Sequence, residues 1–433
     1  MRNTSAVEEL PASYKKENLI PLIATFGPHA VIGNQEFDTN HKLVKMIFEG
    51  KPTIKGNAWV IRCRYIETFD FSKVSSPVAP GANNLGAVGE LVTGAKKIIV
   101  PKGCAATYYA ASTWKQLVDV NSYVIEEQSN VEYSTDGGTT WGSAIPDGAF
   151  TTLAVKGNIT AATLDEIKTA LDAKSEAVAI DLSQTEYESD TFPDTFAGTK
   201  ATPYDKLKSI NFPSNVITMV ASAFSYCSAL ETVDLTGIEY LTEAANGTMY
   251  AFANSGLKTI TFPSTFKGPM ERSFVSTYEL ESIYWNTPWN PGTSQNWRTF
   301  QWGRGNSSAT DNTPKSRDLV LTIGLGAVGL PMNGFRNNHN LTRVVVEASS
   351  GFKFYNNCFA NCDNLAVFEL KGALPPVINN ANVYTGMSTS VAAGNKKIII
   401  PKGATAAYEA HANWAAWETM ANALGFTVEE AAE

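Results

Sequence analysis

The stretch that decides the fold is AFSYCSALETVDL at residues 223–235, and CFANCDNLAVFEL at residues 358–370 repeats its pattern. In both stretches a phenylalanine is followed three residues later by a cysteine and three residues further on by a leucine. The leucine opens a short segment in which apolar and polar residues alternate, which is typical of a strand with one buried face. Each stretch therefore predicts one turn of chain that ends in a short, half-buried strand.

The same unit recurs along the chain, with an aromatic or aliphatic residue in first place, a small or polar residue in the middle and Leu or Ile in last place. The leading and final residues are Phe37 and Leu43, Val60 and Ile66, Phe252 and Leu257, Phe274 and Leu280, and Phe335 and Leu341. The final residues are 23 positions apart from 43 to 66, 27 from 230 to 257 and 24 from 341 to 365. A period of 20–29 residues with one strand per unit predicts a leucine-rich-repeat solenoid with parallel short strands.

Two related segments predict the ends of such stacks, which need caps because a terminal unit has no neighbour to cover it. KKIIVPKGCAATYYAASTW at residues 96–114 and KKIIIPKGATAAYEAHANW at residues 396–414 are identical at 11 of 19 positions. Each has an apolar strand, a Pro-Lys-Gly turn and an alanine-rich segment that favours a helix. The sequence therefore predicts two tandem solenoids with helical caps: residues 1–127 and 158–433.

Residues 128–157, between the two solenoids, follow a different pattern. The segment STDGGTTW at residues 134–141 places Asp136, Gly137 and Gly138 between β-prone flanks, which predicts a hairpin linker. It also matches the Asp-box of sialidase-like propellers, although that box occurs here in one copy. A capping-box pattern from Thr163 to Glu166 predicts a helix at 164–172 that covers the start of the second solenoid.

The F-x-x-C-x-x-L units at Phe224 and Phe359, the alternating strands that follow them and the two I-x-P-K-G…Y…W caps resemble the BspA-like leucine-rich repeats of bacterial surface proteins. The likeness covers about residues 37–120 and 177–417. An insertion after Trp285 lengthens one unit to about 40 residues and leaves the strand register open around residues 316–330. The resemblance implies a non-catalytic adhesion or protein-binding module.

The cysteines and the glycine-rich segment could suggest a metal, redox or phosphate site, but their positions in the repeats favour structural roles. Cys63, Cys227 and Cys362 share the middle position of the unit, so we expect buried structural thiols there and at Cys104 and Cys358, with no metal or cofactor. The glycine-rich segment 324–329 lies inside a repeat, which favours a turn over a phosphate loop. A formal charge of −8 without a basic run argues against a nucleic-acid partner. The apolar run 19–26 is too short for membrane insertion.

Two surfaces are candidates for binding a glycan or protein partner. The insertion gathers aromatic and basic side chains, and local packing is the alternative explanation for them: Trp285, Trp289, Trp297, Arg298, Phe300, Trp302 and Arg304. Outward-facing strand positions should line up on the sheet of the second solenoid, where an ordinary solvated face is the alternative: Lys208, Asn211, Glu231, Asp234, Lys258, Glu281, Tyr284 and Arg343.

These observations favour a non-enzymatic recognition or display protein. If a leader has been removed, we expect an extracellular adhesin of the bacterial cell surface. If Met1 is the native start, a bacteriophage virion component is the expectation, with other virion proteins among its partners. The alternatives are a glycosidase, suggested by the Asp-box and the tryptophans, and a structural scaffold that assembles with its own copies.

Overall fold

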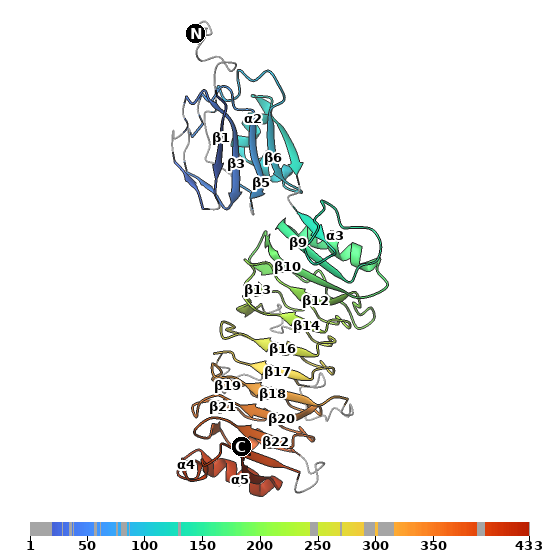
Figure 1. Ribbon diagram of the computed structural model, residues 1–433, viewed down its shortest axis with the longest axis vertical. Helices are drawn as coiled ribbons and strands as arrows, with labels where there is room; N and C mark the ends of the chain where they lie inside the picture. Colours follow the sequence, from blue (N-terminus) through green and yellow to red (C-terminus); the bar gives the residue numbers. More distant parts are fainter. Residues whose placement is uncertain are drawn as a thin grey trace.

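The computed structural model describes residues 20–27, 29–33, 37, 39–55, 59–60, 62–74, 77–78, 85, 87–128, 131–242, 250–268, 271–289, 299–301, 316–387 and 395–432. The chain forms two stacks of short coils, each built mainly of parallel strands, and the coils follow the sequence from blue to red in Figure 1. The predicted fold class, a leucine-rich-repeat-type solenoid with parallel short strands and helical caps, is confirmed.

The first stack is built on a five-stranded parallel sheet in the order β1-β3-β5-β6-β7. Two helices between β6 and β7 cover the last coil, as the Ala-rich segment predicted, and a short two-stranded sheet, β2-β4, runs along another side. Its elements are β1 (Leu22–Phe26), β2 (Val31–Ile32), β3 (Leu43–Gly50), β4 (Thr53–Ile54), β5 (Thr68–Val74), β6 (Lys97–Pro101), α1 (Ala105–Ala110), α2 (Ser112–Asp119) and β7 (Val124–Gln128).

The second stack begins with an antiparallel pair and continues as parallel coils. Its large sheets run β8-β9-β10-β12-β14 and then β16-β17-β18-β20-β22-β24-β25, and smaller sheets lie beside them. The strands of the large sheets are β8 (Glu132–Ser134), β9 (Thr152–Ile159), β10 (Val178–Tyr187), β12 (Leu207–Asn211), β14 (Thr232–Asp234), β16 (Thr259–Phe262), β17 (Ser282–Trp285), β18 (Leu319–Ile323), β20 (Leu341–Val346), β22 (Val367–Leu370), β24 (Lys397–Ile400) and β25 (Thr427–Glu430).

Short strands on another side of the coils form the sheets β11-β13-β15 and β19-β21-β23, and helices cover the two ends of the stack. These elements are α3 (Ala161–Asp172), β11 (Thr191–Phe192), β13 (Thr218–Met219), β15 (Tyr240–Leu241), β19 (Gly329–Leu330), β21 (Lys353–Phe354), β23 (Val377–Ile378), the 3-10 helix η3 (Ala381–Tyr384), α4 (Thr405–Glu409) and α5 (Trp414–Leu424).

The segment predicted as a hairpin linker is continuous with the second sheet. Tyr133 and Gly142 close a hairpin through two backbone hydrogen bonds, and β8 and β9 join the sheet that contains β10. Inside the loop the Asp136 carboxylate accepts hydrogen bonds from Ser134 and Thr140, which hold its pKa well below the usual value. The Asp-box pattern is therefore a structural turn here.

The helix predicted at 164–172 begins one turn earlier than expected. Thr160 is the N-cap of α3 and exchanges hydrogen bonds with Thr163 three residues later. The capping box therefore runs from Thr160 to Thr163, because a threonine in third place supplies the side-chain oxygen that a glutamate usually supplies.

The leading phenylalanines of successive coils form one continuous stack through the second solenoid. The ring centroids of Phe224 and Phe252 are 5.4 Å apart, those of Phe252 and Phe274 5.0 Å, and those of Phe274 and Phe300 4.9 Å. Phe335 follows at 4.8 Å from Phe300. Each ring therefore forms part of the floor for the next, which is the dependence between neighbours expected of a solenoid.

The residues around each leading phenylalanine adopt an unusual backbone. Positions two before and two after it have positive φ in several coils, for example Asn333 at 57° and Asn337 at 60° around Phe335. Asparagine tolerates this left-handed region better than most residues. The geometry explains why the later coils are rich in asparagine beside their phenylalanines.

The middle cysteines occupy equivalent places, as predicted. The thiols of Cys63, Cys227 and Cys362 each donate a hydrogen bond to the backbone carbonyl of the leading phenylalanine of the preceding coil, at distances of 2.8, 3.0 and 3.0 Å. Burial raises the pKa of the Cys227 thiol to about 12, so it stays protonated. Cys358 is also buried, whereas Cys104 in the first cap is only half-buried, which corrects the expectation for that residue.

The insertion after Trp285 contains a further coil that the repeat pattern did not reveal. Phe300 stacks between Phe274 and Phe335, and its backbone N–H donates to the carbonyl of Gly334 at 2.6 Å. The open strand register is resolved by β18, in which Leu321 stands between Ile283 of β17 and Val344 of β20. The lengthened unit therefore keeps one strand and one stacked phenylalanine.

The residue before each leading phenylalanine points into the core, and in two coils it carries a hydroxyl. Ala223, Gly334 and Cys358 fill this position elsewhere, whereas Ser273 and Thr299 are buried there and their hydroxyls have no hydrogen-bond partner among the described residues. A buried hydroxyl without a partner costs free energy.

We expect the substitution Ser273→Ala to raise the free energy of unfolding of the second solenoid by about 1 kcal/mol, because it removes a buried unsatisfied hydroxyl. Chemical denaturation measures the change. The control is Thr277→Val, which deletes a buried hydroxyl that does donate, to the carbonyl of Phe274 at 2.7 Å. This control should be destabilising, and a loss of stability in Ser273→Ala as well would show that its hydroxyl has a partner.

Candidate binding surfaces

The outward face of the second solenoid's sheet presents two rows of small polar side chains. Parallel register places Ser209 beside Thr232 and Asn211 beside Asp234. One strand further on, Thr259 stands beside Ser282 and Thr261 beside Tyr284, and the N–H of Lys258 bonds the carbonyl of Glu231 between the two pairs of strands. We call these residues the polar face: Ser209, Asn211, Thr232, Asp234, Thr259, Thr261, Ser282 and Tyr284.

The polar face brings together three of the predicted sheet residues. Asn211, Asp234 and Tyr284 stand in one row across β12, β14 and β17, and Thr261 continues that row on β16. Asn211 donates a hydrogen bond to Asp181 at 3.3 Å, and Asp234 accepts one from the backbone of Thr236 at 2.8 Å. Because their apolar neighbours along each strand point into the core, these polar groups stay at the surface.

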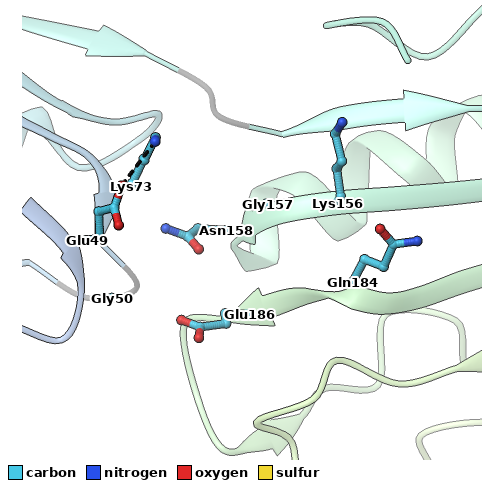
Figure 2. A pocket seen from close by; sticks show the side chains of 8 residues that line it. All are labelled: Glu49, Gly50, Lys73, Lys156, Gly157, Asn158, Gln184 and Glu186. Carbon is cyan, nitrogen blue, oxygen red and sulfur yellow. Dashed lines mark hydrogen bonds and ion pairs between the residues drawn. The ribbon is translucent and has the colours of Figure 1, made fainter. Parts of the chain in front are cut away.

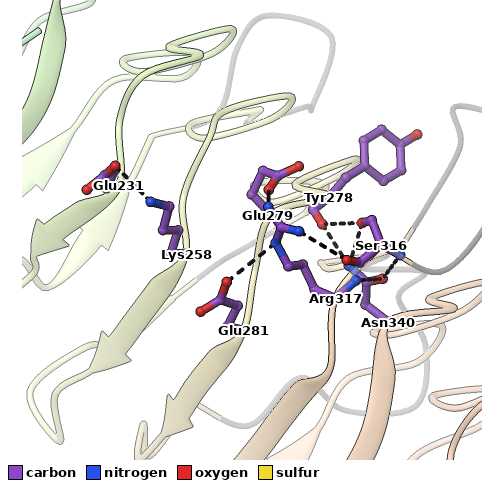
Figure 3. A network of polar contacts seen from close by, with 8 residues as sticks. All are labelled: Glu231, Lys258, Tyr278, Glu279, Glu281, Ser316, Arg317 and Asn340. Atoms are coloured by element: carbon purple, nitrogen blue, oxygen red, sulfur yellow. Dashed lines mark hydrogen bonds and ion pairs between the residues drawn. The ribbon is translucent and has the colours of Figure 1, made fainter.

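Three of the predicted charged residues, Glu231, Lys258 and Glu281, lie one position before β14, β16 and β17 and alternate in sign. Lys258 forms an ion pair with Glu231 at 2.8 Å, and Arg317 contacts Glu281 at 3.4 Å. Figure 3 shows these pairs beside the entry to β16 and β17. The hydrogen bond from Lys258 lowers the pKa of Glu231, and the bond to Glu231 raises the pKa of Lys258. Exposed ion pairs of this kind contribute little to stability, but each pair neutralises the two charges that form it.

The remaining predicted sheet residues lie at the margins of the polar face. Lys208 is exposed at the entry to β12. Arg343 lies on β20, beyond β18, and its guanidinium forms an ion pair with Glu369 on β22. Arg343 is therefore separated from the polar face by β18 and is already paired.

The described aromatic residues of the insertion pack against the solenoid. Trp285 and Phe300 are fully buried, and the indole N–H of Trp285 donates to the carbonyl of Gly329 at 3.1 Å. This corrects the expectation that these two residues contact a ligand, because the alternating pattern of β17 turns Trp285 inward and the aromatic stack encloses Phe300. Trp289 is half-buried beside Gly268, a residue with φ of 71° where a Cβ would lie 2.6 Å from the indole. Trp297, Arg298, Trp302 and Arg304 lie outside the described residues.

A buried asparagine fastens the chain where it returns from the insertion. The side-chain oxygen of Asn340 accepts hydrogen bonds from the backbone N–H groups of Ser316 and Arg317 at 2.9 and 3.0 Å. Its amide nitrogen donates to the carbonyl of Tyr278 at 2.7 Å (Figure 3). One side chain therefore ties together the coil before the insertion, the end of the insertion and the coil after it.

One pocket at the start of the second solenoid has two acidic residues that are adjacent in sequence, and the glycosidase alternative would need a pair of acids in a cleft. It has a volume of about 690 Å³ and lies between α3 and the loop after the hairpin, with Asp165 and Glu166 in its wall. Glu166, however, is paired with Lys102 of the first solenoid. The described residues Trp285, Trp289 and Phe300 do not line this pocket.

The described part of the chain has neither a cluster of metal-ligating side chains nor a helix that could span a membrane. Within it, His, Cys, Asp and Glu side chains form no group of three or more that could hold a metal ion. Across the same residues, no helix has the length and apolar character needed to cross a membrane.

Several solved structures of leucine-rich repeat proteins are similar to this chain. Among solved structures, the chain is similar to a leucine-rich repeat protein from Bacteroides ovatus, with 15% identity, a TM-score of 0.32 and coverage of 94% of this chain and 92% of that one. A leucine-rich cell surface protein from Faecalibacterium prausnitzii matches with 15% identity, a TM-score of 0.23 and coverage of 95% and 88%. The pneumococcal vaccine antigen PcpA matches with 11% identity, a TM-score of 0.21 and coverage of 71% and 98%.

Identities and TM-scores this low assign no activity to this chain. A search of curated proteins found no significant match. The family model for the BspA-type leucine-rich repeat region matches residues 195–291 and 322–403, in six copies. These matched residues carry the polar face and the stacked phenylalanines other than Phe300, which lies between the two matched ranges. Over these residues the chain matches the BspA-type leucine-rich repeat family.

Proposed function

We propose that the chain is a non-catalytic recognition protein of a bacterial cell surface, in which the second solenoid presents its polar face to a protein or glycan. The observation that carries the proposal is the polar face itself, whose side chains form a broad array of hydroxyl, amide and carboxylate groups. The apolar residues that alternate with them along each strand are buried in the core, whereas these polar groups project outward from the sheet. Such an array suits a partner that offers many hydrogen-bonding groups.

The match to BspA-type repeats supports surface display and adhesion, because the chain resembles the repeats of bacterial surface proteins. The alternative setting, a bacteriophage virion, stays a proposal of lower rank because none of the matches reported above is a virion protein. The neighbourhood of the gene distinguishes the settings: capsid and tail genes would favour the virion, and genes of exported proteins would favour the cell surface.

We expect the double substitution Thr232→Arg and Thr259→Arg to weaken binding to the partner at least tenfold without changing the melting temperature. Both residues are exposed on the polar face, so two long cationic side chains would block it while leaving the core intact. Binding is measured on glycan arrays and against extracellular-matrix and host-cell proteins, with the full chain as the reference.

The matched control is Ser264→Arg with Thr265→Arg, which adds the same charge at exposed positions in the turn after β16, away from the polar face. Equal loss of binding in both double variants would contradict a role for the polar face and indicate a general charge effect. The same assay with Trp297→Ala and Trp302→Ala tests the proposal that the insertion contributes to binding, and a large fall in melting temperature there would favour packing.

A further inference from the structure

The two solenoids meet at a pocket whose walls come from both of them. Figure 2 shows the ends of β3 and β5 facing β9 and β10 across a hollow of about 530 Å³. The apolar cores on the two sides are separate clusters, so the pocket lies between two independently packed bodies. Its lining consists of Glu49, Gly50, Lys73, Lys156, Gly157, Asn158, Gln184 and Glu186.

The lining excludes several kinds of ligand. It contains two lysines and two glutamates, so it has no excess of positive charge for an anion, and among the described residues it has no group of three His, Cys, Asp or Glu side chains that could hold a metal ion. It also contains no aliphatic or aromatic side chain, whereas pockets for apolar ligands are lined mainly by such groups. The remaining class is a neutral ligand that forms many hydrogen bonds.

Both lysines of the lining are already held by carboxylates. Lys73 pairs with Glu49 at 3.1 Å across β3 and β5, as Figure 2 shows. Lys156 pairs with Glu132 at 2.7 Å and lies 4.3 Å from the centre of the Trp141 ring. These contacts fix the charged groups in place and leave hydrogen bonding as the chemistry of the pocket.

Two side chains of β10 offer that hydrogen bonding. Gln184 and Glu186 alternate along the strand and so project from the same side, and neither side chain has a hydrogen bond or ion pair among the described residues. Parallel register places Lys156 beside Gln184 and Asn158 beside Glu186. An amide that donates and accepts therefore stands next to a carboxylate that accepts, along one wall.

From this arrangement we propose that the junction pocket binds a small neutral saccharide. Sugar hydroxyls both donate and accept, which matches an amide beside a carboxylate, and the volume falls within the range of about 300–1,000 Å³ that small-ligand sites occupy. The inference rests on the proposed recognition function and names a ligand class for it. Because the walls belong to separate cores, an occupied pocket also holds the two solenoids at one mutual angle.

The test measures binding of glucose, galactose, mannose, N-acetylglucosamine, lactose, maltose and cellobiose to the full chain by saturation-transfer NMR and calorimetry. We expect at least one sugar to bind at millimolar concentration or below, and the double substitution Gln184→Ala with Glu186→Ala to weaken it at least tenfold. The control is Ser183→Ala, an exposed neighbour on β10 that does not line the pocket. Thermal unfolding checks that each variant is folded.

Each outcome decides between the proposals. If no sugar of the panel binds, or if the double variant binds as the full chain does, the pocket proposal is wrong. Tighter binding of inorganic phosphate than of any sugar would overturn the charge argument. The double variant Thr232→Arg with Thr259→Arg separates the two proposals. If it still binds both the sugar and the partner, the pocket proposal stands and the polar face is rejected as the recognition surface.

Discussion

Replacement of Phe300 by alanine is expected to lower the free energy of unfolding of the second solenoid by about 3–5 kcal/mol, the usual cost of emptying a buried phenylalanine site. The ring is fully buried and stacks on Phe274 at 4.9 Å and Phe335 at 4.8 Å. Its loss would interrupt the aromatic stack at a point where neighbouring coils depend on each other. Denaturant unfolding followed by tryptophan fluorescence measures the effect, with the two solenoids analysed as separate transitions because their cores are separate.

The matched control is Trp289→Ala, which removes a larger side chain that is only half-buried. We expect it to cost less than Phe300→Ala, about 1–2 kcal/mol, because part of its surface already faces water. If Phe300→Ala cost no more than this control, Phe300 would not belong to the continuous stack. Phe300→Leu should recover part of the loss, since it refills most of the volume.

Replacement of Asn340 by leucine is expected to cost about 2–4 kcal/mol, because it leaves several backbone groups of the buried clamp without partners. The N–H groups of Ser316 and Arg317 and the carbonyl of Tyr278 would all lose their hydrogen bond to this side chain. The same denaturant experiment measures the loss. Hydrogen exchange should show that protection falls first around residues 316–323, where the chain returns from the insertion.

Asn364 supplies the comparison for Asn340, because it precedes the leucine of the next unit and makes one hydrogen bond, to the carbonyl of His339 at 2.8 Å. Asn364→Leu should cost about 1 kcal/mol. An equal cost for both variants would mean that the extra bonds of Asn340 are not formed in solution. Asn340→Asp should fall between them, since a carboxylate can accept from Ser316 and Arg317 but cannot donate to Tyr278.

The parts of the fold that follow fixed spacing could be predicted from the sequence. The leading phenylalanines, the middle cysteines and the cap helices are each specified by residue type at a constant distance from neighbouring motifs. Cys227 and Cys362 accordingly make the same hydrogen bond in different coils. Repetition supplies this information many times over, so an error in one unit is corrected by the others.

The features that spacing did not predict depend on irregular segments. The coil of Phe300 escaped notice because 19 residues, from 300 to 319, separate its phenylalanine from the strand leucine, where the regular unit has six. The final strands β7 and β25 lie beyond the caps and have no repeat motif. The place of β9 in the second sheet also has no signal, since no phenylalanine–cysteine–leucine unit precedes its strand.

The candidate surfaces were predictable to different degrees. Alternation along the strands predicted that Asn211, Asp234 and Tyr284 would share a face, because side-chain direction follows from position in a strand. The same rule, applied to Trp285, would have turned it inward with Ile283. The junction pocket could not be predicted, since Lys73 and Gln184 are brought together only by the mutual placement of two separate cores.

The coil that carries Phe300 shows that the solenoid tolerates a lengthened segment within a single coil. Each layer touches only the layers above and below it, and lengthening a surface excursion costs free energy that grows only with the logarithm of its length. A lineage of such proteins could therefore exchange or extend the excursions of single layers, while the hydrogen-bonded frame beneath them stays the same.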